Sequence, residues 1–227
     1  MKKRNTELFY LLTLILDGLC CAMLTKSDFG VSVLSSLPYV LSNIFTFISY
    51  GTFSTIIQII LLIILVIITR QFKVTYIMSF IVGFLYGVFL DIFMYLLSFI
   101  EMTVPIRIFM FVSGFIILCK VQAAYFVSGM PLMPFDAFVA DLVHYTDTNV
   151  FKVKTMQDMT FLISAVVLSL CYFHTLIGVG IGTILIAFMT GFLQQKTVDY
   201  LNRNFKFETC TEIGLKLQQM AKIEKRQ

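Results

Sequence analysis

Three charged side chains, Asp17, Asp91 and Lys120, lie inside long apolar runs of the sequence. A charge at the middle of a membrane helix costs about 3 kcal/mol on insertion scales, so each of them needs a partner or a role. Asp17 and Lys120 lie in runs that correspond between the two halves of the chain, which predicts an ion pair between them. The alternative is that each faces its own polar cluster or reaches toward the interface. For Asp91 the expected partners are Arg107 and Lys26.

Two interrupted segments follow apolar runs in the two halves of the chain. They are Ser27–Leu41, SDFGVSVLSSLPYVL, and Ser128–Asp141, SGMPLMPFDAFVAD. Both open with helix-breaking Gly or Pro and continue as a short half-polar stretch. Interrupted helices of transporters free backbone groups that line a central site. The sequence therefore predicts a substrate-binding site formed by Asp17, Gly30, Ser32, Ser35, Asp91, Lys120, Pro134 and Asp136.

Motifs of catalysis and cofactor binding are not found in the sequence. There is no His-Glu-x-x-His, no Gly-x-Ser-x-Gly and no phosphate-binding Gly-Lys-Ser/Thr loop. The repeated glycines from Gly178 to Gly182 follow no strand, so they do not form a dinucleotide fingerprint. The two histidines are far apart, and the five cysteines show neither metal-ligand spacing nor a disulfide framework. We expect no enzymatic activity, no metal and no cofactor.

The composition is that of a membrane protein. Of the 227 residues, 59% are hydrophobic and only 13% are charged, whereas soluble domains are about a quarter charged. Apolar runs long enough to cross a bilayer recur along the chain. We predict an all-α integral membrane protein with six transmembrane helices, over residues 7–25, 51–69, 76–100, 106–127, 156–173 and 177–193.

The six spans group into two repeats of three spans, residues 1–103 and 104–195, with a basic tail over 196–227. Each repeat has a broken or re-entrant short segment after its first span, over 26–49 and 128–150. Small residues four apart recur at matching places, Gly83 and Gly87 in the first repeat and Ala187 and Gly191 in the second. Because three spans is an odd number, the second repeat enters the membrane from the opposite side, which makes the repeats inverted.

The positive charges predict the orientation of the chain. With the N-terminus inside, 14 of the 17 Lys and Arg residues fall on the cytoplasmic side. Only Lys26 and Arg107 fall outside, and Lys120 lies within a span. The N- and C-termini are therefore both expected in the cytoplasm, with the broken segments dipping in from opposite faces. An alternative is that these segments lie flat at the two interfaces. In the tail, Thr209 to Glu212 fits a capping box that opens a short helix.

Several short motifs resemble a known family. In the first half these are Phe29-Gly-Val-Ser32, Pro38-Tyr39, Ser49-Tyr-Gly-Thr52 and Val82–Gly87 with Asp91. In the second half they are Pro134-Phe-Asp136, Lys154 and Gly178–Thr183. Over roughly residues 10–200 the chain resembles the YczE-like bacterial membrane proteins of the YitT/YyaS/YczE group. The resemblance implies a protein of the bacterial cytoplasmic membrane with about six spans and without a settled activity.

The function expected from these patterns is that of a small-molecule or ion transporter, or a solute-binding membrane protein, with a site at the midplane. One alternative is a non-catalytic accessory membrane protein, and another is the substrate-binding subunit of an energised importer. The expected partners are the lipid bilayer, a small solute or ion, and a second copy in a homodimer. Nucleic acid is not expected, although the pI is near 8.8, because the positive charges sit beside apolar spans.

Overall fold

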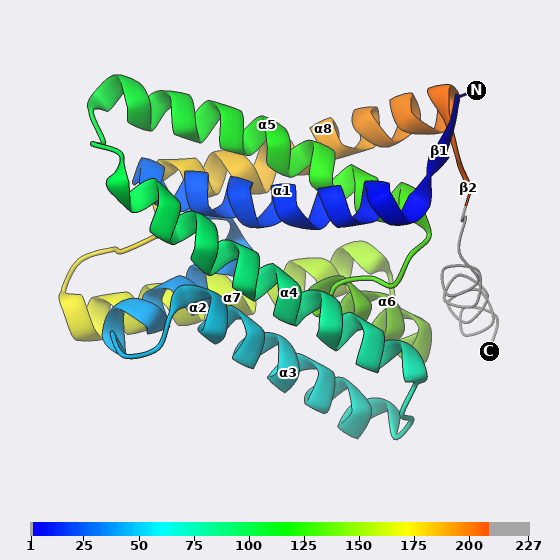
Figure 1. Ribbon diagram of the computed structural model, residues 1–227. Helices are drawn as coiled ribbons and strands as arrows, with labels where there is room; N and C mark the ends of the chain where they lie inside the picture. Colours follow the sequence, from blue (N-terminus) through cyan, green and yellow to red (C-terminus); the bar gives the residue numbers. More distant parts are fainter. Residues whose placement is uncertain (1, 209–227) are drawn as a thin grey trace.

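The computed structural model describes residues 2–208 and is almost entirely helical (Figure 1). The first half contains α1 (Thr6–Ser27), α2 (Val33–Ile44), α3 (Tyr50–Thr69), α4 (Val74–Leu96) and the short 3-10 helix η1 (Leu97–Phe99). The second half contains α5 (Val104–Ser128), α6 (Pro134–Thr146), α7 (Val150–Phe173) and α8 (Ile181–Asn204). Two strands, β1 (Lys2–Asn5) and β2 (Phe205–Glu208), flank the helices. Both halves have the same order of long and short helices.

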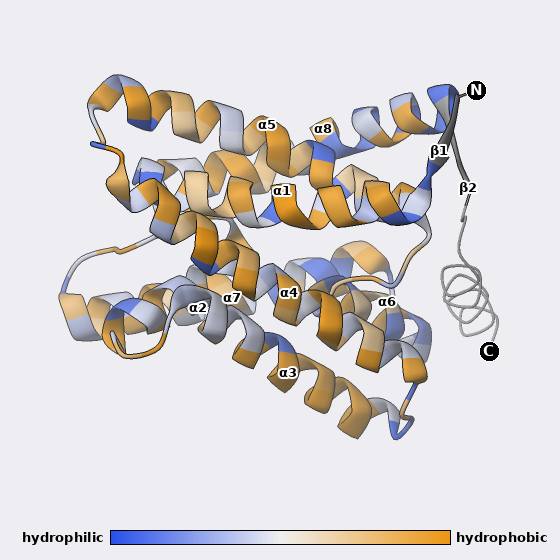
Figure 2. Cartoon of the chain, in the orientation of Figure 1, coloured by the Kyte–Doolittle hydropathy of each residue, from blue (hydrophilic) through white to orange (hydrophobic). Residues whose placement is uncertain are grey.

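Five helices are long and apolar enough to cross a membrane: α1, α3, α4 continued through η1, α5 and α7. Figure 2 shows hydrophobic residues along α1, α3, α4 and α5, and hydrophilic residues toward the end of α8. The all-helical membrane class predicted from the sequence is confirmed. The predicted sixth span overlaps α8, whose apolar part, Ile181–Thr190, is shorter than the others. α8 also continues to Asn204, past the predicted end of that span at residue 193.

The most extensive contact between two helices is that of α1 with α5. α4 packs against α1, and α8 packs against α5. The short helices bridge the halves, because α2 packs against α7 while α6 packs against α3. α3 also packs along α4, whereas α7 and α8 separate and lie in different layers of the molecule (Figure 1).

Glycines bring α3 and α4 very close together. A Cβ on Gly51 would lie 2.0 Å from the carbonyl oxygen of Gly87, so neither position has room for a side chain. One turn away, a Cβ on Gly83 would meet Oε1 of Gln58 at 2.2 Å and Pro134 at 3.1 Å. The small-residue face of α4 therefore packs inside the chain, against α3 and α6. The corresponding Ala187 on α8 is exposed.

The connections after α1 and α5 have matching conformations. Both helices end in a left-handed residue, Asp28 with φ 62° and Gly129 with φ 64°. At Ser27 and at Ser128 the hydroxyl donates to the carbonyl three residues earlier and accepts the N–H two residues later. Each connection then leads into a short helix. The correspondence predicted between these two segments thus extends to their hydrogen bonds.

The two ends of the described chain lie side by side. β1 pairs with β2 in parallel, with Lys2 opposite Phe205, and both lie at one end of the helix bundle (Figure 1). We call this the strand end. The other end, called the opposite end, carries the connections after α1, α4 and α7. The predicted capping box at Thr209 and most of the basic tail lie outside the described residues.

Candidate binding cavity

A cavity of about 520 Å³ lies between the two halves, with walls from α1, α2, α4, α5 and α6 and with contributions from α7 and α8. Its lining includes Asp17 and Cys21 of α1 and Ser32 and Ser35 at the start of α2. The exposed residues of its lining all lie toward the strand end, and they are Phe126, Gly129, Ala140, His144 and Val150. The cavity therefore reaches from the middle of the molecule to the strand end. Its volume is within the range of small-molecule sites.

Asp17 is a buried carboxylate in the wall of this cavity, with only 8% of its surface exposed. The hydroxyl of Tyr125 donates to its Oδ2 at 3.2 Å, and the thiol of Cys20 lies 3.8 Å from its Oδ1. Within the described residues no Lys or Arg forms an ion pair with it. Among the described contacts, the hydrogen-bond partners of the Asp17 side chain are thus neutral groups.

The predicted ion pair between Asp17 and Lys120 is wrong. Lys120 is exposed on the outer side of α5, whereas Leu118 and Gln122 of the same helix line the cavity. Successive helix residues are turned by about 100°, so a residue two positions from the cavity-facing ones points away from them. Lys120 therefore takes no part in the cavity.

The first turn of α2 forms the end wall of the cavity. Ser32 is the N-cap, but its hydroxyl donates to Oγ of Ser35 at 2.9 Å and does not cap the helix. The thiol of Cys21 lies 3.4 Å from the same Oγ, and the hydroxyl of Tyr50 donates to the Ser35 carbonyl at 3.3 Å. No acidic residue occupies this first turn, so the positive end of the α2 dipole faces the cavity uncompensated.

The first turn of α6 forms a second wall. Pro134 is the first residue of the helix and is buried, and proline fits this position because it lacks the N–H that would stay unbonded there. Asp136, in the same turn, lines the cavity. The two short helices thus both begin at the cavity, and they run toward different ends of the molecule. Ser32, Ser35, Asp136 and Asp17 are the predicted site residues that the structure brings together around one space.

Gly30 lies outside the cavity and closes the opposite end of the molecule. Its φ is 126°, and a Cβ there would lie 2.5 Å from Oγ1 of Thr183. Two backbone hydrogen bonds join this connection to the start of α8, from the N–H of Val31 to Gly178 at 2.9 Å and from the N–H of Gly182 to Phe29 at 2.8 Å. We call this backbone pairing of residues 29–31 with 178–182 the seam.

Asp91 has a structural contact instead of a place in the cavity. Its Oδ1 accepts the N–H of Gly51 at 2.7 Å, and its Oδ2 accepts the hydroxyl of Ser49 at 2.5 Å. The carboxylate therefore caps α3 and compensates the positive end of that helix. The predicted partner Arg107 instead pairs with Asp28 at 2.9 Å. A partner for a charge in an apolar run need not be a charged residue.

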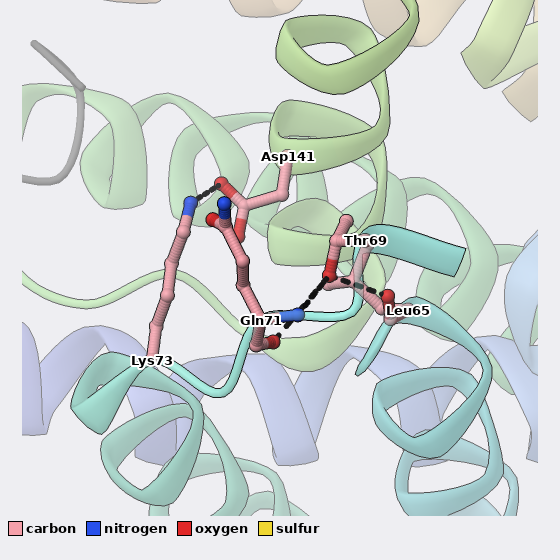
Figure 3. A network of polar contacts seen from close by, with 5 residues as sticks. All are labelled: Leu65, Thr69, Gln71, Lys73 and Asp141. Carbon is pink, nitrogen blue, oxygen red and sulfur yellow. Dashed lines mark hydrogen bonds and ion pairs between the residues drawn. The ribbon is translucent and has the colours of Figure 1, made fainter. Parts of the chain in front are cut away.

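The strand end of the cavity is bordered by ion pairs. Nζ of Lys73, in the connection between α3 and α4, lies 3.0 Å from Oδ1 of Asp141 on α6. Figure 3 shows this pair beside the end of α3, where the Thr69 hydroxyl donates to the Leu65 carbonyl at 2.8 Å. On α7, Lys154 pairs with Asp158 at 3.2 Å. The pair of Lys73 and Asp141 links α6 to the α3–α4 connection, whereas the pair on α7 lies within one helix.

Sequence reasoning missed several residues of the cavity wall, among them Cys21, Tyr86, Tyr125, His144 and Lys154. For Cys21 a signal was available, because it follows Asp17 by one helical turn and so shares its face. No comparable signal exists for Tyr86 and Tyr125, which come from other helices. Aromatic residues at helical spacing are typical of any packed membrane helix.

Comparison with known proteins identifies the family but no characterised relative. No curated protein and no solved structure matches the chain. A family model matches residues 3–197, which is most of the sequence. The YczE-like resemblance stays a prediction. The chain belongs to a family of unknown function, DUF6198.

Proposed function

We propose that this membrane protein is a small-molecule transporter or solute-binding protein whose binding site is the central cavity. The observation that carries the proposal is the cavity itself. It contains Asp17 of α1, it is bordered by the first turns of two short helices, and the exposed residues of its lining lie toward the strand end. Its walls are largely apolar but include carboxyl and hydroxyl groups, which water or a bound solute would contact.

We further infer that the chain consists of two inverted repeats, α1–α4 and α5–α8, with α8 as the sixth span. The matching connections at Ser27 and Ser128 support this relation. So do the reciprocal contacts, since α4 packs on α1 as α8 packs on α5, and α2 packs on α7 as α6 packs on α3. A pseudo-two-fold axis between α1 and α5 accounts for both the matching connections and the reciprocal helix contacts. Both chain ends then lie on one side, which the positive charges assign to the cytoplasm.

An inverted repeat suggests how access to the cavity changes. At the opposite end the seam joins residues 29–31 to 178–182, and in this proposal it is the closed gate of the cavity. The symmetry-related pairing would join residues 130–132 to the α3–α4 connection at the strand end, where the cavity is open. Exchange between these two pairings would alternate access between the two sides of the membrane, as in other transporters with inverted repeats.

Cysteine accessibility tests the cavity. In a variant that lacks the five native cysteines, single cysteines are placed at Gln122, which lines the cavity, and at Lys120, which lies two residues away on the outer face of α5. A membrane-impermeant maleimide should label Gln122→Cys in inside-out vesicles but not from outside in intact cells. Lys120→Cys should label slowly from both sides, because a thiol in lipid does not ionise readily. Equal labelling of the two positions, or none at Gln122→Cys from either side, would contradict the proposal.

The same approach distinguishes transport from simple binding. Val31 is buried under the seam, while Asp28 is exposed at the same end. If access alternates, Val31→Cys should label slowly from outside, and Asp28→Cys should label fast. If Val31→Cys never labels from outside while Gln122→Cys labels from inside, the cavity opens to one side only. A solute-binding or accessory role would then replace transport.

A further inference from the structure

The charges that line the cavity do not balance. Of its three aspartates, Asp141 is paired with Lys73. Lys154 is paired with Asp158, so it brings no net charge to the wall. Asp17 and Asp136 remain, and within the described residues neither forms an ion pair. Both residues line the same space.

The two short helices offset only part of this negative charge. The first turn of each helix lies in the cavity wall, and a helix N-terminus acts as roughly half a positive charge. The two N-termini thus compensate about one of the two carboxylates. When both carboxyl groups are ionised, an excess of about one negative charge remains in the interior of the bundle, where a charge is costly unless it is paired. One monovalent cation would restore the balance.

The wall around Asp17 favours an organic cation over a metal ion. The groups next to its carboxylate are a phenol and a thiol, from Tyr125 and Cys20, and no group of His, Cys, Asp and Glu suited to a metal ion occurs in the described residues. Hard metal ions need six or more oxygen ligands. Most other lining residues are apolar or aromatic, including Tyr86 and Phe135. Aromatic faces attract organic ammonium groups, and apolar walls accept their hydrocarbon part.

We infer that the cavity binds an organic monocation, a protonated amine with an apolar body, and that the ammonium group pairs with Asp17. This inference rests on the proposed function and names the substrate class of the same site. The ammonium donates hydrogen bonds to the Asp17 carboxylate, and Asp136 adds to the attraction from the first turn of α6. The apolar body occupies the wider part of the cavity toward the strand end, beside Phe135 and Met130.

A series of probes of one shape and different charge tests the inference. Binding of tritiated 4-phenylbutylamine to the purified full-length protein in detergent is measured by scintillation proximity. The unlabelled amine, 4-phenylbutanol and 4-phenylbutyrate then compete against it. The amine should compete about ten- to a hundred-fold better than the alcohol, as expected for a charge-assisted hydrogen bond. The carboxylate should not compete. No amine binding up to about 10 mM, or equal competition by amine and alcohol, would overturn the inference.

Variants locate the binding group. Asp17→Asn keeps an acceptor for Tyr125 but removes the charge, so it should weaken amine binding about ten-fold or more. Asp28→Asn removes a carboxylate at the opposite end, where the left-handed backbone suits asparagine, and should bind the amine as the wild type does. Equal losses in both variants would contradict a role for Asp17. If Asp17→Asn does not fold, the competition series on the wild-type protein still decides the question.

The cysteine-labelling experiment distinguishes a failure of the cation inference from a failure of the proposed function. A preparation in which Gln122→Cys labels but no amine binds would leave the cavity as a site and reject the cation. A preparation in which Gln122→Cys does not label from either side would reject the proposed function itself.

Discussion

Replacing Gly51 with alanine tests how closely α3 and α4 must approach. The new Cβ would lie 2.0 Å from the carbonyl oxygen of Gly87, and ordinary contact begins at 3.4 Å. The helices must therefore separate by the difference, 3.4 − 2.0 = 1.4 Å, at this point. Both atoms at the clash belong to or adjoin the backbone, so no side-chain rotation can relieve it.

The separation has a cost that can be worked out from the neighbouring contact. The N–H of Gly51 donates to Asp91 at 2.7 Å, and a shift of the same size would carry it beyond hydrogen-bonding distance. Loss of a hydrogen bond to a charged group costs about 1.5–3 kcal/mol, and overpacking costs about 1–3 kcal/mol. Alanine recovers up to about 1 kcal/mol through its helix propensity. We expect the free energy of unfolding to fall by about 3 kcal/mol.

The assay is reversible unfolding by SDS in mixed micelles, followed by far-ultraviolet circular dichroism. Gly114→Ala is the matched control, because Gly114 lies within α5 and its Cβ would meet atoms of α1 at 3.2–3.3 Å, which small shifts relieve. This control should change the free energy of unfolding by less than about 1 kcal/mol. If Gly51→Ala stays within about 0.5 kcal/mol of wild type, or if both variants lose the same amount, the argument from close approach is refuted.

Substitutions at three further sites, each compared with a second variant, give expected outcomes in the same unfolding assay. Gly30→Ala should lower the free energy of unfolding by about 2–3 kcal/mol, because the φ of 126° at this position is strained for alanine. Gly129→Asn, at φ 64°, should lower it by less than about 1 kcal/mol. Equal losses in the two variants would contradict the special role of Gly30. Asp91→Asn keeps a hydrogen-bond acceptor and should lower the free energy of unfolding by about 1 kcal/mol, and Asp91→Ala should lower it by about 1 kcal/mol more. The reverse order would show that the carboxylate does not cap α3. Lys73→Met should lower the free energy of unfolding by about 1 kcal/mol or less, because the ion pair of Lys73 with Asp141 is partly exposed. Adding Asp141→Asn to this variant should recover part of the lost stability. Additive losses would mean that the ion pair contributes nothing to stability.

Much of the helical framework could be predicted from the sequence. Of the six spans predicted from length and hydropathy, five coincide with helices that are long and apolar enough to cross the membrane, because a bilayer crossing requires a long apolar run. The helix-breaking residues near Gly30 and Pro134 marked where the short helices begin, since both residue types act locally on the backbone. The small-residue face of α4 was also visible, but its partners on α3 and α6 were not.

Errors occurred where a prediction needed the rotation of a helix. The depth of Lys120 along α5 follows from counting residues, but its direction depends on which face packs against α1. Asp91 was assigned a basic partner because both lie at the same depth, and the structure instead uses it to cap α3. A residue count gives height along a helix axis and leaves the rotation about that axis open.

The sequence by itself determined the membrane class, the long helices and the two short segments, because these depend on local hydrophobicity and on backbone preferences of Gly and Pro. The tertiary structure decided that Asp17 from one half and Asp136 from the other face one cavity. It also decided that this cavity opens toward the strand end. Such contacts depend on how all the helices pack together, and residues far apart in the chain carry no local signal of that packing.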